Sequence, residues 1–208
     1  MSNEHTHHHD DHAPIVHEEK PGYYEILETS IRELLIERGL IGPDEIREQI
    51  ELLDSRTPAL GSKLVARAWV DPDFKKRLLD NGIAAAGEMG ITIYDDTEFT
   101  VLENTDHVHH VVVCTLCSCY PRAVLGLPPD WYKSKEYRSR TVYEPRVVLA
   151  EFGTVIPENM EICVNDSTAN LRYMVLPLRP KGTERYSEKQ LEALVTRDAM
   201  IGVKVLQV

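Results

Sequence analysis

Apolar side chains recur every three or four positions near the start of the chain. In residues 23–38 they are Tyr24, Leu27, Ile31, Leu34 and Leu35. This spacing predicts an amphipathic helix that ends near Gly39. Residues 43–53 repeat the pattern behind a proline, a residue that the first turn of a helix accepts. Each apolar stripe could pack on the protein's own core or cover a second chain, and the pattern favours neither.

Helical patterns continue to about residue 80. Residues 60–69 carry another helical stretch, and Asp71-Pro72 gives a cap and a first-turn proline for a helix over residues 74–79. Beyond Gly90 the pattern changes to alternation of apolar and polar residues. It predicts strands over residues 91–94, 99–102, 108–113, 161–164 and 171–176.

Short helical segments are predicted between and after these strands. They cover residues 121–126, 129–132, 134–140 and 144–152. A capping box from Ser187 to Gln190 begins a last helix. Because helices come first and strands later, without regular alternation of the two, the pattern predicts an α+β fold.

The charge balance excludes some classes of function. The formal net charge is −11, which argues against nucleic-acid binding by bulk electrostatics. No apolar run approaches the roughly 18 residues of a membrane span. The N-terminus lacks the basic-then-apolar pattern of a secretory signal, and three of the four cysteines are clustered rather than scattered. We therefore expect a cytoplasmic protein without a membrane segment.

Three of the four cysteines fall within six residues, directly after the apolar run Val111–Val113. Cys114, Cys117 and Cys119 form a C-x-x-C-x-C pattern, which indicates a metal site. A structural zinc site that also uses Cys163 is an alternative. An iron–sulfur cluster also requires four thiolates, and a disulfide framework lacks a secretory context.

The spacing permits an unusual ligand set. The backbone nitrogens of Ser118 and Cys119 lie between the sulfurs of Cys117 and Cys119 along the chain. If both amides lose their protons, two nitrogens and two sulfurs can surround one ion in a plane. Cys114 can supply an axial thiolate and leave the sixth position open. Such a site suits a low-spin trivalent cobalt or iron ion.

The segment from Cys114 to Cys119 resembles the metal-binding claw of the nitrile hydratase alpha subunit and of the related thiocyanate hydrolase gamma subunit. The resemblance continues through almost the whole globular part of the chain. It includes residues 125–133, Arg138, residues 144–146, residues 148–153, residues 172–177 and residues 201–202. Thr115 resembles the cobalt branch of the family, whereas the iron branch usually has serine at this place.

The resemblance implies a layered α-β-β-α domain with an N-terminal helical arm and the claw at an interface. We expect a disordered histidine-rich tail over residues 1–21, the helical arm over residues 22–80 and a metal-binding catalytic domain over residues 81–208. The tail's histidines fit a cloning tag or weak metal capture. His107, His109 and His110 are expected in solvent or behind the ligands. Cys163 is expected to be a buried small residue.

For chemistry, the resemblance implies a lyase that hydrates a nitrile to the amide at a non-corrin Co(III), with iron less expected. A trivalent ion with an open position can act as a Lewis acid. The chain would work with a beta subunit, as a heterodimer or heterotetramer, and with an activator or cobalt chaperone. Cys117 would be oxidised to cysteine sulfinic acid and Cys119 to cysteine sulfenic acid, while Cys114 would stay a thiolate.

Candidate catalytic residues are Cys119, Ser118 and Arg122. Thr115, Asp166 and Arg172 are expected to support the site, or to form ordinary loop and strand-end contacts. Arg122 stands where cobalt nitrile hydratases usually carry tryptophan and thiocyanate hydrolase carries arginine. A cation there suits an anionic substrate. The alternatives are therefore a thiocyanate hydrolase gamma-like subunit and a non-catalytic cobalt-binding protein. The family's glutamine-containing turn is also replaced, by residues 89–94.

Overall fold

A computed structural model describes residues 21–93, 97–117 and 119–208. The expectations for the histidine-rich tail up to residue 20 and for Ser118 lie outside the described residues. The chain divides into two compact units, one up to Gln49 and one from Ile50 to Val208.

The N-terminal unit is helical, as predicted. Helix α1 spans Tyr23–Glu37, and α2 spans Pro43–Ser55 and continues into the second unit. Gly39 takes a positive φ of 64°, a conformation that suits glycine and ends the first helix. No residue of α1 or α2 is buried, and Ile31 and Leu34 are 50% and 46% exposed. Among the described residues, the apolar stripe of α1 is therefore largely exposed.

Three helices open the second unit: α3 (Pro58–Val70), α4 (Pro72–Asp80) and α5 (Gly82–Glu88). The side chain of Asp71 accepts a hydrogen bond from the Phe74 backbone N–H at 2.9 Å, so the predicted cap is confirmed. Leu64, Val65 and Phe74 are buried in the core of this unit. Helices α3 and α4 thus belong to the same compact unit as the strands, because they pack on its core.

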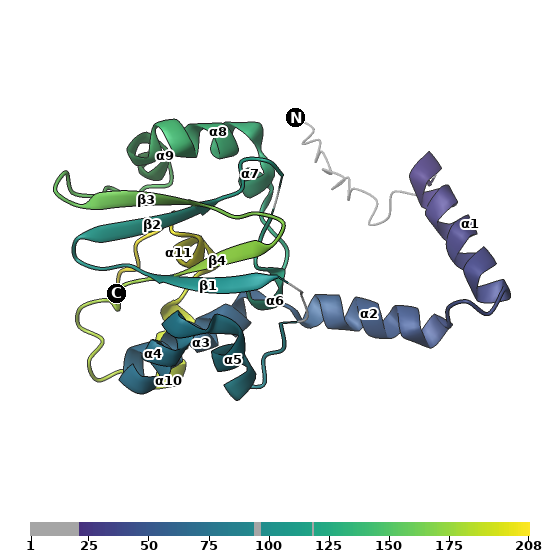
Figure 1. The fold of residues 1–208 in the computed structure, drawn as a ribbon, viewed down its shortest axis with the longest axis horizontal. Helices are drawn as coiled ribbons and strands as arrows, with labels where there is room; N and C mark the ends of the chain where they lie inside the picture. Colours follow the sequence, from purple (N-terminus) through teal and green to yellow (C-terminus); the bar gives the residue numbers. More distant parts are fainter. Residues whose placement is uncertain (1–20, 94–96, 118) are drawn as a thin grey trace, which may run out of the picture. The chain divides into compact units, whose positions relative to one another are not determined.

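Two pairs of parallel strands form the centre of this unit (Figure 1). Strand β1 (Glu98–Glu103) pairs with β4 (Leu171–Leu176), and β2 (Val108–Val113) pairs with β3 (Glu161–Asp166). Four of the five predicted strands are confirmed. The fifth prediction was wrong at residues 91–93, which are not a strand. The Ile91 backbone N–H instead donates to the Ala86 carbonyl and closes the end of α5.

Helices flank the strand pairs on two sides (Figure 1). Helices α8 (Lys135–Tyr143) and α9 (Pro145–Glu151) contact β2 and β3. On the other side, α4 and α5 contact β1, and α10 (Glu188–Leu194) packs on α3. Helix α11 (Arg197–Ile201) contacts both β2 and β4. Helices α6 (Arg122–Leu125) and α7 (Asp130–Lys133) follow β2 in the chain. The predicted mixture of helices and strands is confirmed.

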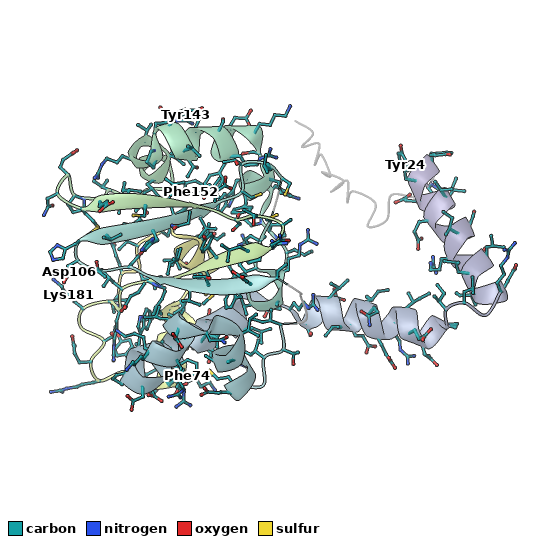
Figure 2. All side chains as sticks on the ribbon, viewed as in Figure 1. Tyr24, Phe74, Asp106, Tyr143, Phe152 and Lys181 are labelled. Atoms are coloured by element: carbon teal, nitrogen blue, oxygen red, sulfur yellow. The ribbon has the colours of Figure 1, made fainter. Side chains whose placement is uncertain are left out.

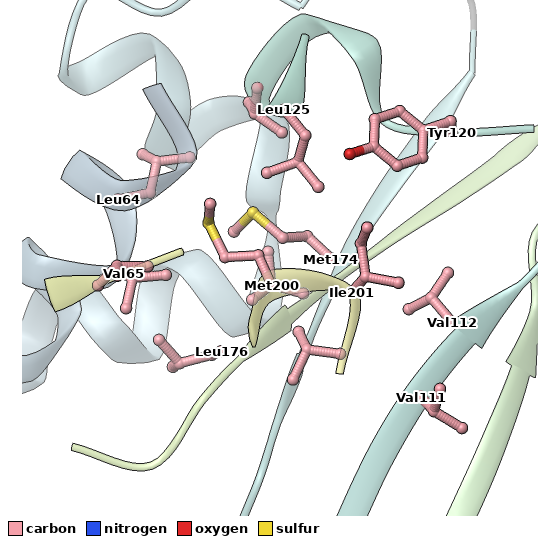
Figure 3. Packing of buried hydrophobic residues seen from close by; sticks show 14 of the residues in the cluster. Leu64, Val65, Val111, Val112, Tyr120, Leu125, Met174, Leu176, Met200 and Ile201 are labelled. Atoms are coloured by element: carbon pink, nitrogen blue, oxygen red, sulfur yellow. The ribbon is translucent and has the colours of Figure 1, made fainter. Parts of the chain in front are cut away.

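The core lies where α3, β4 and α11 meet (Figure 3). Leu64, Met174, Met200 and Ile201 are fully or almost fully buried there. Labelled aromatic residues differ in burial: Phe74 is buried, whereas Tyr24 and Tyr143 are more than 80% exposed (Figure 2).

In the part of the chain that the structure describes, every helix is too short or too polar to cross a membrane.

Candidate metal centre

Strand β2 carries the chain from the core to the cysteine cluster. Val111, Val112 and Val113 are buried, and Cys114 directly follows the last of them. Asp166, the last residue of β3, is the register partner of Val113. The parallel pair therefore brings Asp166 beside the start of the cluster, although 52 residues separate it from Cys114 in the sequence.

The three cysteine sulfurs converge. Sγ of Cys117 lies 3.4 Å from Sγ of Cys114 and 3.1 Å from Sγ of Cys119. All three sulfurs lie within 4.8 Å of one another. Cys114 and Cys119 are buried, whereas Cys117 is exposed. The cluster thus has one side in the protein and one side open.

These separations fit a particular coordination geometry. With metal–sulfur bonds of about 2.3 Å, two sulfurs at a right angle lie about 3.3 Å apart, and two at the tetrahedral angle lie about 3.8 Å apart. The observed distances of 3.4 and 3.1 Å match the right angle. These two separations are therefore compatible with square or octahedral coordination.

Cys163 does not join the cluster that the described residues form. It lies within β3 opposite His110, and its Sγ is 3.6 Å from Oε1 of Glu161. The expectation that it is fully buried was wrong, because it is partly exposed. Without a fourth thiolate, the four-cysteine zinc and iron–sulfur alternatives lose support.

Burial raises the pKa of the Cys119 thiol well above its ordinary value. The neighbouring thiols of Cys117 and Cys114 raise this pKa further, and the positive charge of Arg172 opposes the shift. Three adjacent thiolates repel one another. The cluster therefore needs a multivalent cation to hold all three in the deprotonated form.

The turn after Cys114 is fixed by Asp166. The Thr115 backbone N–H donates to Oδ1 of Asp166 at 2.9 Å, and the Thr115 hydroxyl donates to Oδ2 at 2.6 Å. Thr115 and Asp166 thus contact each other at the start of the cluster, and their supporting role stays a prediction. Arg172 donates to the Thr168 carbonyl in the loop between β3 and β4, and its charge acts on Cys119 from there.

Arg122 is the first residue of α6 and is exposed. It lines a small cavity together with Arg172, Pro121 and Ile93. Two arginine residues thus line one small cavity, which Pro121, two residues after Cys119, also lines.

Two residues near the cluster were missed as site residues. Tyr132 donates its hydroxyl to the Cys119 carbonyl at 2.9 Å. Arg138 donates to the carbonyls of Thr115 at 3.0 Å and Leu116 at 3.4 Å. In the sequence they stood out only as part of the family resemblance, which includes residues 125–133 and Arg138, and no role was attached to them.

Among the histidines before the cluster, His109 forms hydrogen bonds inside the core. Nε2 of His109 donates to the Gly202 carbonyl at 2.7 Å, and Nδ1 of His109 accepts from the Asn104 amide at 3.2 Å. His109 is only 3% exposed. It is thus a core residue rather than one in solvent or behind the ligands.

Comparison with known proteins matches this chain to one protein family. The family model for "Nitrile hydratase, alpha chain" matches residues 22–204. The alpha subunit of the low-molecular weight cobalt-containing nitrile hydratase of Rhodococcus rhodochrous is 54% identical, over 83% of this chain and 84% of the relative. The thiocyanate hydrolase gamma subunit of Thiobacillus thioparus is 43% identical, over 93% and 83%.

A solved structure of an Fe-type nitrile hydratase from Comamonas testosteroni Ni1, a double mutant, has the same fold. Its TM-score is 0.82 at 44% identity, over 89% of this chain and 91% of that one. The family model and the identities over most of both chains lead to one conclusion. The chain belongs to the nitrile hydratase alpha-chain family.

Proposed function

We propose that this chain is the alpha subunit of a cobalt nitrile hydratase. The observation that carries the proposal is the convergence of the thiols of Cys114, Cys117 and Cys119, whose sulfurs lie within 4.8 Å of one another. The 54% identity to a cobalt-containing alpha subunit, together with Thr115 inside the cluster, favours cobalt over iron.

The proposed ligands are the sulfurs of Cys114, Cys117 and Cys119 and the backbone nitrogens of Ser118 and Cys119. When bound, Co(III) supplies a Lewis acid for the addition of water to the carbon–nitrogen triple bond. We further propose that Cys117 is a sulfinate and Cys119 a sulfenate. The sulfenate oxygen is a candidate base or nucleophile.

Residues of this chain shape the approach to the site. Because Cys117 is exposed while Cys114 and Cys119 are buried, a substrate reaches the cluster from the Cys117 side. Asp166 holds the turn at Thr115, and the positive charge of Arg172 counteracts the repulsion among the thiolates. Arg122 is proposed to orient polar or anionic substrates.

A beta subunit is the proposed partner, in a heterodimer or heterotetramer, and an activator is proposed to deliver cobalt. The uncovered stripe of α1, including Ile31 and Leu34, supports a partner on that helix. The order of helices and strand pairs in the second unit supports the α-β-β-α layering.

Thiocyanate hydrolysis is the second candidate function. It is favoured by the cavity that Arg122 and Arg172 share, because two guanidinium groups suit an anion. The 43% identity to a thiocyanate hydrolase gamma subunit adds support.

The test is a set of kcat/KM values for acrylonitrile, benzonitrile and thiocyanate, measured on the chain produced with its genomic neighbours in cobalt-supplemented cells. Amide production from either nitrile supports the first proposal. Thiocyanate turnover without amide production supports the second. Cobalt binding without any turnover would contradict both and leave a cobalt-binding protein.

A further inference from the structure

Side chains of helices α7 and α8 donate hydrogen bonds to four backbone carbonyls in and just before the cysteine segment. Tyr137 donates to Val112 at 2.7 Å, before the cluster. Arg138 donates to Thr115 and Leu116, inside it. Tyr132 donates to Cys119, at its end. Side chains from one short stretch thus contact the segment along its length.

The peptide between Leu116 and Cys117 is fixed on both sides. Its carbonyl accepts from Arg138 at 3.4 Å, and its N–H donates to Sγ of Cys114 at 3.3 Å. The preceding residue, Thr115, is also fixed at its N–H and its carbonyl, by Asp166 and Arg138. Rotation of either peptide would break these bonds and move the Cys117 thiol.

The tyrosine donors are rigidly mounted. Tyr132 is 0% exposed, and its ring lies 5.1 Å from that of Tyr120 and 5.7 Å from that of Tyr137, centroid to centroid. Trp131 packs edge-on against Tyr137 at 4.9 Å. Because the rings are held by packing, the hydroxyl of Tyr132 has a fixed position relative to the Cys119 carbonyl.

We propose that Tyr132 and Arg138 are positioning residues that hold residues 115–117 and Cys119 in the metal-binding shape before the ion arrives. This inference rests on the proposed function of the cluster as a metal site. A preformed loop avoids the entropy of ordering at the moment of binding. Residues that orient metal ligands typically contribute about 10–100-fold to metal affinity.

The test measures the binding of divalent cobalt to the reduced, full-length chain without oxygen, in competition with a chelator. Thiolate-to-cobalt charge-transfer absorption distinguishes the cluster from the histidine-rich tail. The variants are Arg138→Gln, Arg138→Lys and Tyr132→Phe. We expect about 10–100-fold weaker binding for Arg138→Gln and Tyr132→Phe. We expect an intermediate loss for Arg138→Lys, because one ammonium group cannot reproduce the planar guanidinium.

Matched controls separate positioning from general stability. Arg146 also donates to loop carbonyls, those of Ile156 and Pro157, but away from the cluster. Arg179 likewise donates to the carbonyls of Trp69 and Thr183. Arg146→Gln and Arg179→Gln should keep cobalt affinity within twofold, whatever their effect on Tm. If a variant fails to fold, the remaining ones carry the comparison, since each removes a different contact.

The outcomes distinguish the inference from the function on which it rests. Wild-type binding with unchanged affinity in Tyr132→Phe and Arg138→Gln would overturn the positioning role and leave the metal site standing. Equal losses of cobalt affinity in the controls and in the test variants would also overturn the positioning role. Absence of thiolate–cobalt absorption in the wild type would refute both proposals.

Discussion

Asp166 illustrates how one side chain can shape a metal centre without supplying a ligand. Its two oxygens accept from the backbone and hydroxyl of Thr115, and its place as register partner of Val113 puts it there. The sequence identified Asp166 and Thr115 as candidates only through family resemblance. The contact itself depends on the pairing of β2 with β3, which is a long-range event that spacing does not reveal.

The cysteines give the first prediction at the residue scale. Peptide mass analysis of the active, metal-loaded protein should find two added oxygens on Cys117 and one on Cys119, because metal-bound thiolates oxidise readily. Cys114 and Cys163 should carry none and serve as internal controls. Active protein with four reduced cysteines would contradict this assignment.

Arg122 gives the second prediction at the residue scale. Replacing it with tryptophan removes a permanent charge from the cavity that Arg172 also lines, and adds a ring on which aromatic substrates can stack. Arg122→Trp should raise kcat/KM for benzonitrile relative to acrylonitrile. If the wild type hydrolyses thiocyanate, that activity should fall by about 1–3 kcal/mol in transition-state free energy. Unchanged ratios among the three substrates would mean that Arg122 does not face the substrate.

At the scale of elements, local signals predicted most helices and strands. Asp71 and Ser187 cap their helices through side-chain bonds that the sequence pattern anticipates. Residues 91–93 were mispredicted, since the Ile91 amide is used at the end of α5. The contacts of Tyr132 and Arg138 could not be predicted either, because they require α7 and α8 to fold back over the cysteine segment.

Helix α1 gives the third prediction. Placing a charge on its exposed apolar stripe should weaken association with the partner subunit by about 1–3 kcal/mol, the range of a contributing interface residue. Ile31→Asp is the test and Thr29→Asp, on the polar side of the helix, is the control; pull-down titration with the partner measures both. Equal binding by the two variants would argue that this stripe does not contact the partner.

At the scale of the whole molecule, the chain divides into two compact units at Gln49 and Ile50. Helical periodicity does not reveal which stripe packs on which core. The stripes of α1 and α3 look alike in sequence, yet Leu64 and Val65 of α3 are fully buried while Ile31 of α1 is exposed. Only the tertiary structure separates the arm from the domain.

His109 links β2 to Gly202 at the end of α11 and gives the fourth prediction. Burial lowers the pKa of His109 below its ordinary value of 6.5, and contact with Gly202 partly opposes this. The unfolded chain therefore takes up the proton more readily than the folded one. Stability should be full above about pH 6.5 and should decrease as the pH falls below it.

Thermal unfolding of the metal-free chain between pH 8 and pH 5 measures this effect. His109→Gln should have a lower Tm at pH 8 and a smaller further loss at pH 5, because the titrating group is gone. An identical pH dependence in the variant and the wild type would assign the effect to other groups. His110 is one such group, because burial also lowers its pKa.

The most direct test of the account is the metal content of the purified protein. Elemental analysis should be performed on protein from cobalt-supplemented cells, washed with chelator to remove ions held by the histidine-rich tail. Cys114, Cys117 and Cys119 together predict one cobalt per chain. Stoichiometric zinc with no cobalt would contradict the account.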